Sequence, residues 1–197
     1  MLNQMPIALK VCLATLLLSS AVSAGSVDSG TAPYERCALC HGLFGDTVRT
    51  KFPKLAGQNA AYLEKQIHDF KDGLRTNDGG QMSTVVTEID ESEIPEIVNW
   101  FSTQPPPEAL DTNDPEGESL FIRVGCSSCH LEQVSADSAM PLLSAQHPEY
   151  LSKQMREIRD GMRASGDSGV MKQQLGTLSD AEIDSIAGYL ASRSRVP

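Results

Sequence analysis

The sequence predicts an all-α protein that consists of two tandem copies of one small helical domain. Three observations predict this fold class: a five-residue motif occurs twice, other segments recur at nearly the same spacing, and no segment alternates convincingly as a β-strand would. The motif is CALCH at Cys37–His41 and CSSCH at Cys126–His130, 89 residues further along the chain. We therefore expect an internal duplication of roughly 80 residues, the size of a small domain.

The repeat extends beyond the two motifs. YLEKQ at Tyr62–Gln66 corresponds to YLSKQ at Tyr150–Gln154, at an offset of 88 residues. Met82 corresponds to Met171 at an offset of 89 residues. Because the offset changes by only one residue over this length, the two copies can be aligned position by position.

Each copy should contain two helices with one apolar face. One runs over Ala60–Lys71 in the first copy and over Glu149–Asp160 in the second, and each ends beside a glycine. The other begins at a capping box, Asp90–Glu93 in the first copy and Ser179–Glu182 in the second. These final helices are expected to run to about residues 103 and 193.

The N-terminal 24 residues are typical of a cleavable secretory signal peptide. Lys10 supplies a positive charge, residues 11–22 are mostly apolar, and small residues precede the expected cut. No run is long enough to span a bilayer comfortably, so no membrane span is expected after cleavage. A segment rich in proline and acidic residues is expected to form a linker. The expected organisation is a signal peptide at 1–24, a first domain at 25–103, the linker at 104–116 and a second domain at 117–197.

The chain is acidic, with 26 Asp and Glu residues against 16 Lys and Arg and a formal net charge of −10. Nucleic acids and anionic lipids attract basic surfaces, so neither is expected as a partner. A protein partner with a basic docking site remains compatible with this charge. Cys12 lies in the expected signal peptide, and the other four cysteines all belong to the two motifs.

The CxxCH motif predicts the cofactor. Two thiols one helical turn apart can each add to a vinyl group of a porphyrin, and the following histidine can bind the iron from one side. A bound cofactor would also help to fill the core of a domain this small. The residues predicted to attach two haem c groups covalently are Cys37, Cys40, Cys126 and Cys129, with His41 and His130 as iron ligands.

Two other interpretations of these cysteines explain less. A thioredoxin-type redox pair accounts neither for the histidine behind each motif nor for the lack of a βαβ pattern. A closed zinc site would need ligands brought together from both copies, whereas each copy repeats the same half-site. Haem attachment is the interpretation that fits both motifs.

The ligand on the other face of each iron distinguishes an electron carrier from a protein that binds small molecules at iron. Met82 and Met171 are the expected ligands because a methionine recurs at this position in both copies. The other methionines of the second copy align with other bulky apolar residues of the first and are expected in the core. Bis-histidine ligation is the competing arrangement, but neither remaining histidine recurs at an equivalent position.

Two further pairs of residues are candidates for supporting roles. Pro53 and Pro141 follow the motifs and could offer a carbonyl to the second nitrogen of each axial histidine. Arg75 and Arg163 follow the glycines that end the first helix of each copy and could pair with haem propionates. For the two arginines, a solvated cation at a helix end is the alternative.

These features together resemble the di-haem cytochromes c4 of bacterial periplasms. The signal peptide, the CxxCH motifs, FPKLAGQ at residues 52–58, YLEKQ and the late methionine carry the resemblance, which covers both copies. It implies two class I cytochrome c domains in tandem and a periplasmic electron carrier that is not an enzyme. It also implies a quinol-oxidising complex and a terminal oxidase as partners, and the cysteine, histidine and methionine ligands given above.

The second copy departs from this family pattern at two places. Gly42 follows the first motif, but Leu131 follows the second. Gly57 of the LAGQ string is replaced by Ala145 in the second copy. Both changes concern the backbone near the second haem.

The expected function is to carry single electrons between respiratory redox partners, towards a terminal oxidase. One alternative is a dedicated cytochrome subunit of a periplasmic dehydrogenase, which would co-purify with a stoichiometric partner. A di-haem peroxidase or a haem-based gas sensor would instead need an open or displaceable iron ligand. Peroxide turnover or binding of carbon monoxide would identify these two.

Overall fold

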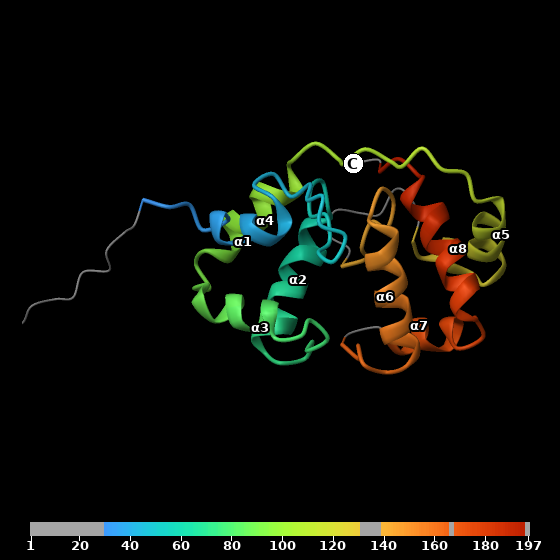
Figure 1. The fold of residues 1–197 in the computed structure, drawn as a ribbon. Helices are drawn as coiled ribbons and strands as arrows, with labels where there is room; N and C mark the ends of the chain where they lie inside the picture. Colours follow the sequence, from blue (N-terminus) through green and yellow to red (C-terminus); the bar gives the residue numbers. More distant parts are fainter. Residues whose placement is uncertain (1–29, 131–138, 166–167, 196–197) are drawn as a thin grey trace, which may run out of the picture. The chain divides into compact units, whose positions relative to one another are not determined.

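A computed structural model of the chain describes residues 30–130, 139–165 and 168–195. Within these ranges every regular element is a helix, which confirms the predicted fold class (Figure 1). No helix in the described ranges is long and apolar enough to cross a membrane. The expected signal peptide at 1–24 and Leu131 lie outside the described residues.

The first half of the structure packs its helices on one apolar core. Its elements are α1 (Glu35–His41), α2 (Ala60–Lys71), α3 (Gln81–Val85), the 3-10 helix η1 (Val86–Glu88) and α4 (Ile94–Ser102). The core is formed mainly where α2 meets α4, and Phe101 and Ile94 are almost fully buried there. Burial of such side chains contributes about 1.5–3 kcal/mol each, so this contact holds the first half together.

The second half repeats this plan with its own core. Its elements are α5 (Pro115–Arg123), the 3-10 helix η2 (Cys126–Ser128), α6 (Pro148–Arg159), α7 (Ser168–Leu175) and α8 (Asp180–Ala191). Helix α8 packs against both α5 and α6, and Ile183 and Ile186 are fully buried in this contact. The apolar face predicted for the final helix is therefore the face that forms the core.

Helices α2 and α6 agree closely with the predicted ranges. Helix α2 begins at Ala60 because the Asn59 side chain accepts hydrogen bonds from the backbone N–H groups of its first turn. Helix α6 has Pro148 in its first turn, where a missing N–H costs nothing. A glycine with positive φ follows each helix, at Gly73 and Gly161.

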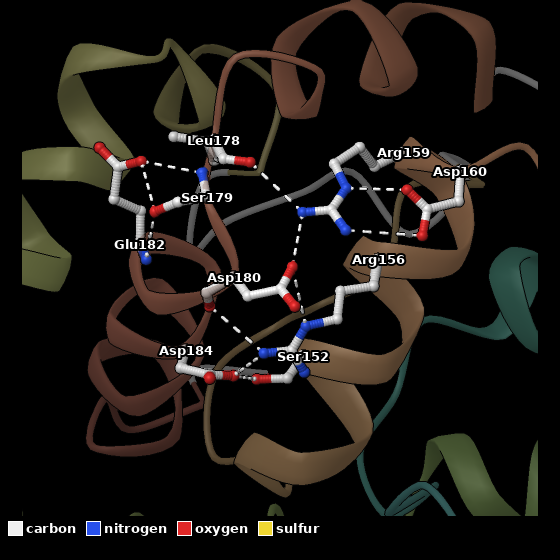
Figure 2. Close-up of polar contacts among 9 residues, drawn as sticks. All are labelled: Ser152, Arg156, Arg159, Asp160, Leu178, Ser179, Asp180, Glu182 and Asp184. Carbon is white, nitrogen blue, oxygen red and sulfur yellow. Dashed lines mark hydrogen bonds and ion pairs between the residues drawn. The ribbon is translucent and has the colours of Figure 1, made fainter.

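The two predicted capping boxes differ in the structure. The one at Ser179–Glu182 is complete, since the Ser179 hydroxyl accepts from the N–H of Glu182 and the Glu182 carboxylate accepts from the N–H of Ser179 (Figure 2). The prediction for Asp90–Glu93 was wrong, because only the Glu93 carboxylate makes its bond and α4 begins later, at Ile94. A helix that began directly after Asp90 would place Pro95 in its interior, where proline clashes with the preceding turn.

Ion pairs tie α6 to the start of α8 on the surface of the second half. Figure 2 shows the Arg159 and Arg156 side chains reaching from α6 towards Asp180 and Asp184. Arg159 Nη1 lies 2.7 Å from Asp180 Oδ1, and Arg156 Nη2 lies 2.7 Å from Asp184 Oδ1. Exposed pairs of this kind contribute little to stability.

Helix α5 has no counterpart among the predicted helices. It begins at Pro115, inside the segment expected to be a linker, and Asp114 caps it by accepting a hydrogen bond of 2.8 Å from the N–H of Gly117. A β-carbon on Gly117 would lie 2.0 Å from the carbonyl oxygen of Ser185 in α8. The absence of a side chain at Gly117 therefore allows α5 and α8 to pack closely.

Reciprocal hydrogen bonds join the two halves. Gln146 accepts from Lys54 N (2.8 Å) and donates to Lys54 O (3.0 Å). Gln58, at the equivalent position of the first half, accepts from Leu142 N (2.8 Å) and donates to Leu142 O (2.9 Å). Both glutamines are buried, with exposed fractions of 4% and 5%. Because Lys54 and Leu142 are also equivalent, the interface has a local two-fold relation that reflects the duplication.

Among the described residues, Ala145 is the one non-glycine residue with a positive φ, at 54°. Its equivalent Gly57 has φ 61°, and a side chain costs roughly 1–2 kcal/mol in this region. We expect Ala145→Gly to raise the free energy of unfolding of the haem-loaded protein by about 0.5–1 kcal/mol. Glycine removes the strain at this φ, but its greater conformational freedom in the unfolded chain offsets part of the gain. Urea denaturation followed by circular dichroism measures the change.

The reverse substitution in the first half serves as its control. Gly57→Ala should lower the free energy of unfolding, because it adds both the strained φ and a β-carbon 3.2 Å from Gln104 O. A loss of stability in Ala145→Gly would contradict the strain argument.

Candidate haem sites

Helix α1 holds the first CxxCH motif. Cys37 and Cys40 lie three residues apart on this helix and so face the same side. None of the four described cysteines forms a disulfide. Burial raises the pKa of Cys37 to about 11 and also raises the pKa of Cys126. A redox-active cysteine pair needs a lowered thiol pKa, so these sites do not have the character of a thioredoxin-type centre.

Aromatic side chains fix α1 to the first core. The Tyr34 ring stacks on the Trp100 ring of α4 with centroids 3.9 Å apart. Trp100 Nε1 also donates a hydrogen bond of 2.8 Å to the carbonyl of Leu43, just after the motif. The motif is therefore held against α4 on both of its sides.

His41 is prepared to bind a metal through its free ring nitrogen. The side chain is buried, and Nδ1 lies 2.9 Å from the carbonyl oxygen of Pro53, which can only accept a hydrogen bond. This contact assigns the N–H to Nδ1 and leaves the lone pair of Nε2 available. Burial lowers the pKa of His41, so the imidazole is neutral near pH 7.

The second motif has the same parts in a looser arrangement. Cys126 begins the 3-10 helix η2, and the N–H of His130 bonds to the carbonyl of Cys126 at 3.0 Å. His130 Nδ1 lies 3.4 Å from the carbonyl oxygen of Pro141, which is long for a hydrogen bond. Burial lowers the pKa of His130 as well. The second histidine is thus neutral but less firmly oriented than the first.

The two predicted methionine ligands occupy equivalent short helices. Met82 lies on α3 and packs against the same core as Cys37. Met171 lies on α7 and packs against the same core as Cys126. Each half thus contains two cysteines, a neutral imidazole and a thioether, a set of groups that fits a c-type haem.

One expectation about the remaining methionines was wrong. Met155 is buried in the core of the second half, as expected, but Met162 is 58% exposed and its equivalent Leu74 is 61% exposed. Both follow the glycine that ends α2 or α6, where the chain has already turned away from the core.

The two predicted arginines lie in the interface between the halves. Arg75 Nη1 donates to Gln66 Oε1 (2.6 Å), and its Nη2 donates across the interface to Gln154 Oε1 (2.9 Å). Arg163 mirrors this, with bonds to Gln154 (2.8 Å) and, across the interface, to Gln66 (3.1 Å). Neither is a freely solvated cation, so that alternative was wrong. The helix-end position in the sequence does not reveal that the other half covers it.

No carboxylate pairs with either guanidinium in the described part of the chain. Arg75 is only 6% exposed, and its partners are neutral side chains. Burial alone would raise the pKa of the neighbouring Tyr62 hydroxyl, but the positive charges of Arg163 and Arg75 outweigh burial and lower it. The interface therefore carries positive charge that an anionic group could balance.

Comparison with known proteins identifies the family. The Cytochrome c family model matches residues 27–105 and again residues 115–194. Cytochrome c4 of Pseudomonas aeruginosa is 34% identical over 188 residues, which cover 88% of this chain and 92% of that protein. The chain belongs to the cytochrome c4 family.

Solved structures agree with this assignment. Reduced recombinant cytochrome c4 from Pseudomonas stutzeri superposes with a TM-score of 0.68 at 28% identity and covers 86% of this chain and 99% of that chain. A more distant relative is the thiosulfate dehydrogenase electron acceptor of Stutzerimonas stutzeri, 27% identical over 170 residues that cover 79% of this chain and 78% of that protein. As a cytochrome c4, this chain carries two covalently bound haem c groups and transfers electrons. It is not an enzyme, so the peroxidase alternative is set aside.

The sequence interpretation missed the cross-interface glutamines of the cytochrome c4 fold. Gln58 and Gln146 are equivalent in the repeat, and the recurrence of a polar residue in both copies could have indicated a structural role for them. Arg195 was also missed, and it offered no such signal because Pro106 stands at the equivalent position, 89 residues earlier.

Proposed function

We propose that this cytochrome c4 carries single electrons in the bacterial periplasm, from a quinol-oxidising complex towards a terminal oxidase. The observation that carries the proposal is the presence, in each half, of a neutral histidine whose Nδ1 faces a proline carbonyl and of a thioether packed on that half's core. Haem c supplies one reversible electron per iron when bound. Protein ligands on both sides of the iron need not leave during transfer, so little reorganisation opposes it.

We assign the ligands of each haem by half. Cys37 and Cys40 attach the first haem, with His41 and Met82 as axial ligands. In the second half the corresponding residues are Cys126, Cys129, His130 and Met171. The short contact from His41 Nδ1 to Pro53 O and the longer one from His130 Nδ1 to Pro141 O support these histidines as oriented ligands.

We also propose that Arg75 and Arg163 each attract a haem propionate. Arg75 is buried and Arg163 is half-buried, and neither has a carboxylate partner in the described ranges, which supports this role because a poorly solvated charge without a partner is costly. Their neutral partners Gln66 and Gln154 can hold the guanidiniums in place while a propionate approaches.

We also propose that the chain is exported and that it consists of two domains joined by a linker. A signal peptide at 1–24 would direct the chain to the periplasm and be removed there. The two domains would then span 25–103 and 117–197, joined by the linker at 104–116, whose last two residues form the start of α5.

A dedicated dehydrogenase acceptor is the second candidate function. The relatedness to a thiosulfate dehydrogenase electron acceptor favours it. In that case the chain would co-purify with one dehydrogenase in a fixed ratio, and its reduction would depend on that enzyme's substrate.

Stopped-flow kinetics with the purified mature protein tests the proposed direction. We expect the reduced protein to be reoxidised by membranes that contain a terminal oxidase, at a rate proportional to its concentration, and to release two electrons per chain. An oxidase inhibitor should abolish the reaction and serves as the control. Rapid reduction by a periplasmic dehydrogenase combined with no reoxidation by membranes would favour the second candidate.

A further inference from the structure

Arg195 connects the two halves from a position after α8. Its side chain is buried, with an exposed fraction of 5%. Nη1 donates to the carbonyl of Ala56 at 2.6 Å, and Nε donates to the carbonyl of Ser144 at 3.1 Å. Ala56 and Ser144 are 88 residues apart and therefore occupy equivalent positions of the repeat. One guanidinium thus binds the same loop in both halves.

These two loops also carry the carbonyls that face the axial histidines. Ala56 lies three residues after Pro53, whose carbonyl contacts His41. Ser144 lies three residues after Pro141, whose carbonyl contacts His130. A side chain that holds both loops therefore acts on both histidines through the backbone.

The charge of Arg195 is poorly compensated. Nη2 is buried without a hydrogen-bond partner, and in the described ranges no carboxylate forms an ion pair with this side chain. Asp46 attracts the charge from a longer distance, but its carboxylate is paired with Lys54. Burial lowers the pKa of Arg195 to about 10, which leaves the guanidinium protonated at pH 7. A buried positive charge favours whichever state of a neighbouring redox centre carries less positive charge.

We propose that Arg195 is a positioning residue shared by both haem sites, which holds the two histidine-facing loops together and favours the reduced state of both irons. This rests on the proposed histidine ligation. Because a single side chain serves both sites, its removal should change both reduction potentials in the same direction. A residue that acted on one loop alone would change one potential.

The test is a spectroelectrochemical titration of the haem-loaded Arg195→Met protein. At a fixed applied potential near each midpoint, we expect the ratio of reduced to oxidised haem to fall about tenfold at both haems, which corresponds to about 59 mV for one electron. Arg193→Met is the matched control, because it removes the same formal charge from an exposed side chain two residues earlier. Solvent screening should keep its effect below about twofold.

Arg195→Gln provides a second neutral variant if Arg195→Met does not accumulate. Its amide can still donate to one of the two carbonyls, and we expect the same downward change at both haems. The proposal is overturned if either variant binds two haems and keeps both potentials, or changes only one of them. A wild-type protein without two haems or without iron–thioether absorption would overturn the proposed ligation first, and this inference with it.

Discussion

Replacing Met82 by alanine should halve the absorption band that reports iron–thioether bonds in the oxidised protein. Met82 and Met171 lie on equivalent helices, and each packs on the core of its own half, so each variant should lose one bond and keep the other. Loss of the thioether also removes a ligand that favours Fe(II), so one of the two reduction potentials should fall. The reduced variant should then bind one carbon monoxide per chain.

Met162→Ala is the control for this experiment. Met162 is 58% exposed and lies outside the core, so its loss should leave the band and both potentials unchanged. An undiminished band in both Met82→Ala and Met171→Ala would show that another residue binds the irons. Attention would then turn to bis-histidine ligation.

Replacing Gln146 by alanine should cause a large loss of stability at the interface between the halves. Its side chain bonds to Lys54 N, Lys54 O and His147 N, all at 2.8–3.0 Å, and is almost fully buried. Unpaired buried backbone groups cost about 1–3 kcal/mol each. Because water can enter the space left by the side chain and bond to some of these groups, we expect a total loss of about 3 kcal/mol. Guanidinium denaturation of the haem-loaded protein measures it.

The double variant Gln58→Ala/Gln146→Ala tests what this interface does for cooperativity. With both reciprocal contacts removed, we expect the two halves to unfold in separate transitions, each reported by its own haem. Gln173→Ala, on the exposed face of α7, is the control and should change the free energy of unfolding by less than about 0.5 kcal/mol. A single unchanged transition in the double variant would show that other contacts couple the halves.

Helices α2 and α6 could be predicted from the sequence because each has a clear apolar period, whereas α5 could not. Helix α2 has the predicted bounds because Asn59 caps it and a glycine follows it. Helix α5 begins with Pro115, and the prolines and acidic residues of this segment were interpreted as signs of a linker. The packing of Gly117 against α8 shows why a glycine belongs there, but that contact is tertiary.

The ligand candidates of the haem sites could be named from the sequence because the duplication repeats them. The same comparison could not place Arg75 and Arg163, since a guanidinium at a helix end looks solvated until the other half is docked on it. Arg195 could not be found at all, because one copy of it serves both halves and the repeat therefore contains no equivalent.

Each half of the chain is proposed to hold one haem c between a histidine and a methionine. The optical spectrum of the purified mature protein in both oxidation states, combined with a pyridine haemochrome count, tests this most directly. We expect two c-type haems per chain, low-spin six-coordinate spectra, and the iron–thioether band in the oxidised form. Two haems without that band, or fewer than two haems per chain, would contradict the proposed ligation.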